Sequence, residues 1–204
     1  MPRRTKEEAD ITRQTVLRAA LAVFSQHGYS ATRLEDIAEA ARVTRGAIYH
    51  HFGGKAELYT DMIIEYSQPI GRIIQQAIDE GGTFEDILKR QFIRMCAALE
   101  DDADLRAIQE ISVMKTEMMP DLAEGIARKM EGMEHQVQFL MEGFKEAIAC
   151  GQLRADLDAE EAARAYFASL NGYMLLWLLD QSSFSIKKSA PAAVDMLFKG
   201  MLPS

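Results

Sequence analysis

Residues 32–55 read TRLEDIAEAARVTRGAIYHHFGGK, and this stretch decides the fold of the N-terminal part of the chain. Thr32 and Glu35 are spaced as a capping box, in which a hydroxyl and a carboxylate accept from the free backbone N–H groups at a helix start. Thr44 is a second good N-cap residue. Only Arg42 and Val43 separate it from Ala41, at the end of the helix that follows Thr32. A connection this short makes two helices cross at a large angle. The stretch therefore predicts two short helices joined by a tight turn.

Apolar residues at helical spacing give these helices, and one before them, a buried face. They are Leu17, Ala20, Leu21 and Phe24 in the first helix, Leu34, Ile37, Ala38 and Ala41 in the second, and Ile48 and Phe52 in the third. Gly28 stands where a left-handed C-cap residue is needed, so we expect the first helix to end near His27. Three helices of this kind predict a helix-turn-helix unit.

The outward face of the third helix has no role in the core. It carries Arg45, Gly46, Ala47, Tyr49 and His50. Arginine binds guanine O6 and N7 with two donors, small residues let the backbone approach the groove, and tyrosine and histidine donate to phosphates. Lys55 follows at the start of the next helix, where a cation is disfavoured by a few tenths of a kcal/mol and a phosphate would be favoured. This chemistry predicts a DNA recognition helix; the alternative is a small helical bundle with solvated charges.

Residues 10–58 resemble the DNA-binding domain of the TetR/AcrR family of bacterial transcriptional repressors. The matching positions are Leu34, Ile37, Ala38, Val43–Tyr49, His51, Phe52 and Lys55. With the residue chemistry above, the resemblance gives the expected DNA-binding residues, which are Thr32, Thr44, Arg45, Gly46, Ala47, Tyr49, His50, His51 and Lys55. Arg42 departs from the family, which usually has glycine in this turn. A left-handed backbone at Arg42 would cost about 1 kcal/mol relative to glycine.

Charge is distributed unevenly along the chain. The net charge of the 204 residues is −8, which for the whole molecule argues against nucleic acid. Residues 1–55, however, hold nine Lys and Arg against six Asp and Glu, whereas the remainder holds 14 against 25. A basic part on an acidic body fits local contact with DNA, and we expect a DNA-binding domain over 1–54 and a second domain over 55–204. The basic arm Pro2-Arg3-Arg4-Thr5-Lys6 either contacts phosphates or forms a loose tail.

The body of the chain predicts an all-α fold of about nine helices in total. Helical patterns, without strand alternation or repeats, cover residues 55–79, 84–99, 104–118, 121–150, 159–180 and 190–201. The helix from residue 121 keeps an apolar stripe over seven turns. The helix from residue 159 is apolar on all sides over residues 173–179, and such a helix must be covered twice. One chain of this size has one core, so we expect a second copy to provide the other cover.

The family resemblance also implies how this body is used. Residues 159–180 and 190–201 would pair with the same helices of a second subunit, and a twofold dimer fits a roughly palindromic operator on double-stranded DNA. Residues 159–179, with Gly151-Gln152-Leu153 before them, resemble the multidrug-efflux (AcrR/TtgR-like) branch, whose body helices line a cavity for aromatic or amphipathic inducers. The implied ligand-binding residues are Leu88, Phe92, Met95, Gln109, Val113, Met133, Val137, Leu140, Phe167, Leu170 and Asn171.

Two features of the body have alternative interpretations. The twelve methionines fit a surface that repacks around varied ligands, but methionine at helical spacing is also ordinary core. Asn171 is polar within an apolar helix, and a buried amide needs hydrogen-bond partners, of which a ligand could be one.

Other classes of protein fit the sequence poorly. The four histidines, His27, His50, His51 and His135, lack metal-ligand spacing, and there is no phosphate-binding glycine loop, so we expect no enzyme, metal or cofactor. No apolar leader occurs at the N-terminus, and two distant cysteines fit a reducing compartment. Residues 162–179 are apolar but include Arg164 and Asn171, which favours a buried helix over a membrane span. We therefore expect a cytoplasmic protein without a membrane partner.

The function expected from these observations is a dimeric transcriptional repressor. A small apolar or aromatic inducer would release it from the operator, and it would control an efflux or detoxification gene. The alternative is a regulator of lipid metabolism that senses an acyl chain. A helical scaffold that only dimerises would leave Arg45, Tyr49 and Lys55 without a role.

Overall fold

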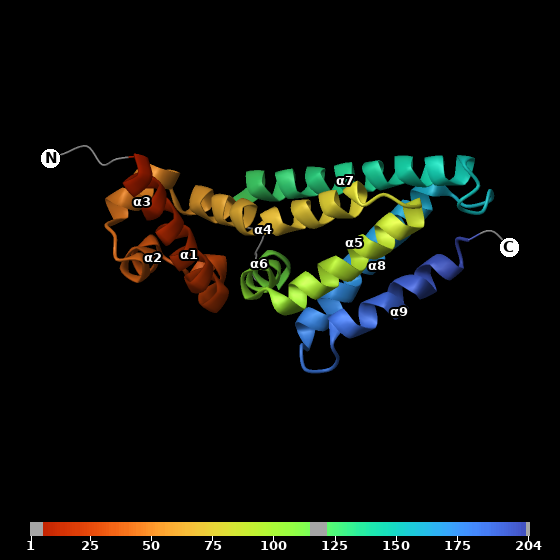
Figure 1. Ribbon diagram of the computed structural model, residues 1–204. Coiled ribbons are helices and arrows are strands. Elements are labelled where there is room, and N and C mark those ends of the chain that lie inside the picture. The colour runs from red at the N-terminus through yellow and green to blue at the C-terminus, as the bar shows by residue number, and fades with distance from the viewer. Residues whose placement is uncertain (1–5, 115–121, 203–204) are drawn as a thin grey trace. The chain divides into compact units, whose positions relative to one another are not determined.

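The computed structural model describes residues 6–114 and 122–202, and these residues form nine α-helices and no strands (Figure 1). The helices are α1 Lys6–Ala31, α2 Leu34–Ala41, α3 Arg45–Phe52, α4 Lys55–Asp79, α5 Phe84–Asp101, α6 Ala103–Met114, α7 Ala123–Ala149, α8 Ala159–Leu179 and α9 Ile186–Lys199. The predicted all-α class is confirmed over these residues. Most of the predicted basic arm and the end of the helix predicted over 104–118 lie outside the described residues.

Contacts divide the described chain into two compact units. The first runs up to Gln68 and also includes the described residues of 104–125, and the second comprises 69–103 and 126–202. The first unit thus holds α1–α3, the first part of α4, and α6 from Asp104 on. Helix α4 continues across the division and carries Pro69 in its interior. The domain boundary expected after residue 54 stays a prediction.

Aromatic rings hold the first unit together. Phe24 is fully buried, and its ring centroid lies 5.9 Å from that of Tyr29 and 5.1 Å from that of Tyr59. The residues predicted to face the core in the first three helices are all buried, which confirms the predicted helix faces. The regular path of α1 ends near His27, as predicted, although a further short turn continues it to Ala31. Gly28 has φ +73° and ψ 176°, which breaks the helical path, and one further turn then places Tyr29 in the core.

The predicted capping box of α2 is wrong by one residue. The N-cap of α2 is Arg33, whose backbone N–H donates to Asp36 Oδ2 at 2.9 Å. Thr32 is buried, and its hydroxyl donates to the Gly28 carbonyl at 2.7 Å. The threonine hydroxyl therefore serves the chain reversal after Gly28, and the N-cap position of α2 is taken by the next residue.

The turn between α2 and α3 has the left-handed backbone anticipated for Arg42. Arg42 has φ 54° and ψ 41°. Among the described parts of the chain, it is the only non-glycine residue with a positive φ. The backbone N–H of Arg42 donates to Glu39 O at 3.0 Å, and that of Val43 donates to Ala38 O at 2.9 Å. These bonds close the end of α2 and fix the conformation of the turn.

Arg42→Gly is expected to raise the free energy of unfolding by up to about 1 kcal/mol. The left-handed conformation costs a residue with a Cβ about 1–2 kcal/mol, and the extra freedom of glycine in the unfolded chain offsets about 0.4–1 kcal/mol of that gain. Urea denaturation measures the difference. Ala40→Gly, two residues earlier inside α2, is the matched control and should destabilise by about 1 kcal/mol. A loss of stability in Arg42→Gly would contradict the assigned strain.

Helix α5 packs along α9 in the second unit, and α8 contacts both. The buried Tyr166 hydroxyl of α8 donates to Leu88 O at 2.9 Å, and Trp177 Nε1 donates to Phe184 O at 3.0 Å. Helix α9 begins four residues earlier than predicted, because Ser185 caps it by accepting from the backbone N–H of Lys188 at 3.2 Å. Sequence reasoning overlooked this serine as an N-cap residue.

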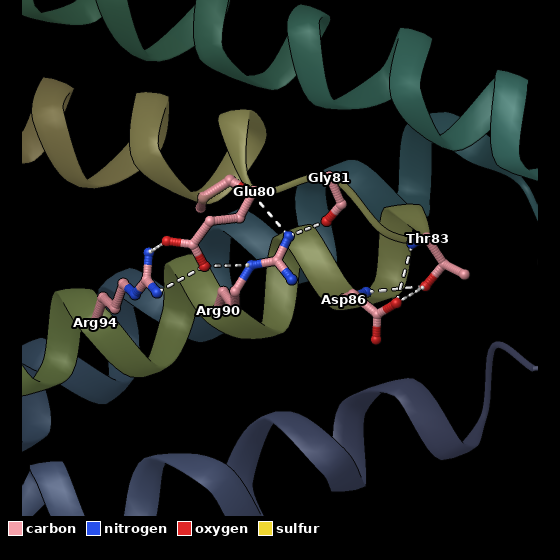
Figure 2. A network of polar contacts seen from close by, with 7 residues as sticks. Glu80, Gly81, Thr83, Asp86, Arg90 and Arg94 are labelled. Carbon is pink, nitrogen blue, oxygen red and sulfur yellow. Dashed lines mark hydrogen bonds and ion pairs between the residues drawn. The ribbon is translucent and has the colours of Figure 1, made fainter.

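Two arginines of α5 fix the end of α4. Figure 2 shows the Glu80 carboxylate between Arg90 and Arg94, and Arg94 donates to it through both terminal nitrogens at 2.8 Å. Arg90 Nη2 donates to the carbonyl of Ala77 at 2.9 Å and to that of Gly81. These contacts lower the pKa of Glu80, chiefly through the Arg94 hydrogen bond. Because the last carbonyls of a helix lack partners within it, Arg90 completes the end of α4 from a neighbouring helix.

Candidate DNA-binding and ligand-binding sites

Helix α3 presents the predicted polar face to solvent. Thr44 is its N-cap, with the hydroxyl accepting from the backbone N–H of Ala47 at 3.2 Å, as expected from the sequence. Ile48 and Phe52 are buried against the first unit. Of the remaining residues, Arg45, Gly46, Tyr49 and His50 are exposed, whereas Ala47 and His51 are half-buried. The local sequence thus orients α3 so that its polar residues stay available for a partner.

Arg45 is the principal cation on this face. Its Nη1 lies 2.5 Å from Glu35 Oε1 on α2, and its Nη2 lies 3.4 Å from the Tyr49 hydroxyl one turn along α3. The guanidinium carbon also lies 5.7 Å from the centroid of the Tyr49 ring. These neighbours raise the pKa of Arg45, first through the Tyr49 hydrogen bond and then through the Glu35 charge. Arg45 therefore keeps its charge and is held toward α2.

Lys55 begins α4, as predicted, but it is half-buried. Its ammonium lies 4.2 Å from the centroid of the Tyr29 ring, which gives it a cation–π contact at the end of α1. Thr32 is buried, and its predicted contact with DNA stays a prediction. The rings of His51 and His50 lie 5.4 Å apart at the end of α3.

Helix α1 connects this surface to α4. Arg13 Nη2 lies 2.8 Å from Asp61 Oδ2, and its guanidinium carbon lies 5.4 Å from the centroid of the Phe52 ring of α3. Gln14 donates to Glu65 Oε1 at 3.3 Å. The beginning of α4 is therefore joined to the unit that carries α3 by polar contacts as well as by the core.

The predicted ligand-binding residues are not all together. Leu88, Phe92, Met95, Leu140 and Leu170 lie in the core of the second unit, and Val137 and Phe167 pack partly buried against it. Gln109 and Val113 lie on α6 in the first unit, where Val113 is exposed. Met133 is 42% exposed on α7, where the predicted apolar stripe is buried only in the C-terminal half. The ligand-binding role of the set stays a prediction.

Asn171 lies on the surface of the single chain and not inside it. Its side-chain amide donates to Phe167 O one turn earlier at 2.8 Å. The expectation that a buried amide there would need a ligand is therefore wrong for this chain alone, because water solvates the group.

Comparison with known proteins defines the family. Residues 16–62 match the model of bacterial regulatory proteins of the tetR family, and residues 85–203 match the C-terminal region of MAATS-type transcriptional repressors. The chain belongs to the TetR family. The transcriptional regulator TtgR of Pseudomonas putida is 35% identical over 97% of this chain and 96% of its own. The TetR-family fold and helix-turn-helix unit predicted from the sequence are thereby confirmed.

Two solved structures resemble this TetR-family chain over nearly its whole length. NalD, the secondary repressor of the MexAB-OprM multidrug efflux pump in Pseudomonas aeruginosa, superposes with a TM-score of 0.85 at 26% identity, covering 97% of this chain and 98% of its own. SmeT is the repressor of a Stenotrophomonas maltophilia multidrug efflux pump, and its structure was solved with triclosan. It superposes with a TM-score of 0.80 at 25% identity, covering 95% of this chain and 93% of its own. Both are efflux-pump repressors.

Sequence reasoning missed an aromatic cluster in the second unit of this TetR-family chain. The Phe92 ring centroid lies 6.3 Å from that of Tyr166 and 5.8 Å from that of Tyr173, and the Tyr173 ring lies 5.7 Å from Phe184. Tyr166 and Tyr173 are seven residues apart on α8, which places them on one helix face. That spacing was the available signal.

Helix α8 of the TetR-family chain also carries exposed leucines, here called the α8 leucine face: Leu175, Leu176 and Leu179. Trp177 and Leu178 on the same helix are buried in the chain's own core. The expectation that this helix is apolar on all sides is therefore confirmed, with one side covered and the other exposed in a single chain.

Cysteine reactivity, metal binding and membrane insertion are the remaining kinds of chemistry to consider. Burial raises the pKa of the Cys96 thiol to about 12, so this cysteine stays protonated near neutral pH. Among residues 6–114 and 122–202, no group of three or more His, Cys, Asp or Glu side chains is placed to hold a metal ion. None of the helices in these ranges is both long and apolar enough to span a membrane.

Proposed function

We propose that the chain is a dimeric, ligand-responsive repressor that binds a palindromic operator through α3 and controls an efflux or detoxification gene. The observation that carries the proposal is the exposed face of α3. Arg45 and Tyr49 on this face do not pack in the core, and Thr44 caps the start of the helix. Arginine, tyrosine and histidine on one helix face are the residue types that read and hold duplex DNA. A regulator of bacterial genes acts in the cytoplasm, where the operator is.

The proposed control of efflux is supported by the relatives. NalD is named as the repressor of a multidrug efflux pump, and SmeT, a repressor of such a pump, was solved with triclosan, a chlorinated aromatic compound. In this chain the Phe92–Tyr166–Tyr173 rings lie in the second unit and supply aromatic faces of the kind such a compound contacts. We therefore infer that the inducer is a small apolar or aromatic molecule.

Coupling between inducer and operator requires only that the ligand bind two conformations with different affinity. Helix α4 belongs to the first unit up to Gln68 and to the second from Pro69. Its beginning is joined to α1 through Asp61, and its end is fixed to α5 by Arg90. Helix α4 is therefore the element through which we propose that the ligand changes the spacing of the two α3 helices in a dimer.

Arg45→Ala tests the DNA-binding role. It is expected to cost about 1–3 kcal/mol on a duplex selected by the protein from a random library, and little on a scrambled duplex, because a base contact carries sequence information. Lys55→Ala is the contrasting variant: it should weaken both duplexes alike and lower the salt dependence by about one ion per subunit. Fluorescence anisotropy at several salt concentrations measures both. Equal losses on both duplexes for Arg45→Ala would show that this residue only holds phosphate.

A further inference from the structure

Glu35 is the residue that holds Arg45 in the absence of DNA. Its carboxylate on α2 lies 2.5 Å from Arg45 Nη1, and the two side chains are 49% and 52% exposed. The Tyr49 hydroxyl occupies a second donor of the same guanidinium, at 3.4 Å from Nη2. Arg45 is thus held by groups from two helices on the surface where DNA would bind.

Folding stability does not explain this ion pair. Water solvates both half-exposed charges, so such pairs contribute little to the stability of a protein. The location is more informative, because Arg45 begins α3 and the first turn of α3 has no acidic residue. A cation at this end of a helix is disfavoured by the helix dipole. Glu35 supplies, from α2, the negative charge that a phosphate would otherwise supply.

The guanidinium can keep Glu35 while it binds a base. It has five N–H donors; even when the Glu35 ion pair and the Tyr49 hydroxyl occupy one donor each, three remain, and two suffice for guanine O6 and N7. Those acceptors carry only partial charges. A phosphate instead brings a full negative charge next to the Glu35 carboxylate, and like charges at this distance repel.

We propose that Glu35 is a specificity-determining residue, whose carboxylate orients Arg45 toward a guanine edge and opposes contact of Arg45 with phosphate. The inference rests on the proposed function, in which α3 enters the major groove of an operator. It follows that the ratio of operator affinity to non-specific affinity depends on the charge at position 35.

Glu35→Gln tests this charge, because glutamine keeps the shape of the side chain. The probes are the duplex selected from a random library by the unmodified protein and a scrambled duplex of the same composition, at one fixed salt concentration. Affinity for the scrambled duplex is expected to rise about tenfold and affinity for the selected duplex about twofold, so that their ratio falls about fivefold. Glu39→Gln is the matched control, with the same charge change one turn later on the same face of α2. It should raise both affinities by one common factor and leave the ratio unchanged.

The Arg45→Ala background separates this inference from the proposed function. There, Glu35→Gln should change both affinities as Glu39→Gln does, because the guanidinium is gone. The inference is overturned if Glu35→Gln lowers the ratio no more than Glu39→Gln, or lowers it equally without Arg45. If Arg45→Ala leaves the affinity for the selected duplex unchanged, base recognition by Arg45 fails as well. If Arg45→Ala lowers the affinity for the selected duplex but Glu35→Gln changes the affinity ratio no more than Glu39→Gln does, only the inference about Glu35 is overturned.

Discussion

Leu176→Glu is expected to convert the protein from dimers to monomers and to lower its affinity for the selected duplex by more than about a hundredfold. Leu176 is 57% exposed in the single chain, on the side of α8 away from its own core. If the α8 leucine face is the dimer interface, the substitution buries an unpaired charge from each subunit, and each such charge costs about 3–5 kcal/mol. Sedimentation equilibrium and anisotropy with the selected duplex measure the two effects.

Two other substitutions separate dimerisation from folding. Ile64→Glu changes a residue that is equally exposed, at 58%, but lies on α4 in the first unit, and it should leave the protein dimeric. Leu178→Glu is unsuitable, because Leu178 is buried within the chain's own core and its charge would unfold the protein. If Leu176→Glu remains dimeric and binds DNA normally, the interface lies elsewhere.

Aromatic inducers are expected to stabilise the protein and release the selected duplex. A ligand at a hundred times its Kd contributes about 2.7 kcal/mol, which for a chain of this size raises Tm by several degrees. Phenolics, flavonoids, dyes and antibiotics are the compounds to screen by thermal shift. Hits from this screen should also reduce anisotropy of the bound duplex, because the ligand-binding conformation is the one that does not fit the operator.

Phe167→Leu locates the binding region for these hits. Loss of the ring face is expected to weaken aromatic ligands about three- to tenfold while leaving affinity for DNA unchanged. Phe139→Leu on α7 makes the same change at a residue that is 63% exposed, and it should have no effect. Equal affinity of the hits for Phe167→Leu and the unmodified protein would misplace the pocket. A screen in which only acyl-chain thioesters bind would favour the lipid-sensing alternative.

Local signals in the sequence were sufficient for most of the fold. Helix α4 spans the range predicted for it, and Thr44 caps α3 as expected, because apolar periodicity and capping act within a few residues. The left-handed backbone of Arg42 was anticipated from the family resemblance, because the family usually has glycine in this turn. Thr32 was misassigned because α2 begins one residue later than predicted, so that Arg33 and not Thr32 stands at the N-cap.

The candidate sites were harder to predict, because periodicity marks a helix face without naming its neighbour. Leu176 and Leu178 are alike in sequence, yet one is exposed and the other lies in the core of its own chain. Asn171 was expected inside for the same reason. The contact of Glu35 with Arg45 joins residues ten apart on different helices, and only the crossing angle of α2 and α3 brings them together.

Pro69 gives α4 a mechanical weak point. Proline has no N–H, so the carbonyl of Glu65 loses its helical partner, and the ring pushes against that carbonyl. The helix is secured on both sides of this point, by Arg13 on Asp61 and by Arg90 on the Ala77 carbonyl. We therefore expect α4 to bend more readily at Pro69 than at any other point of the helix.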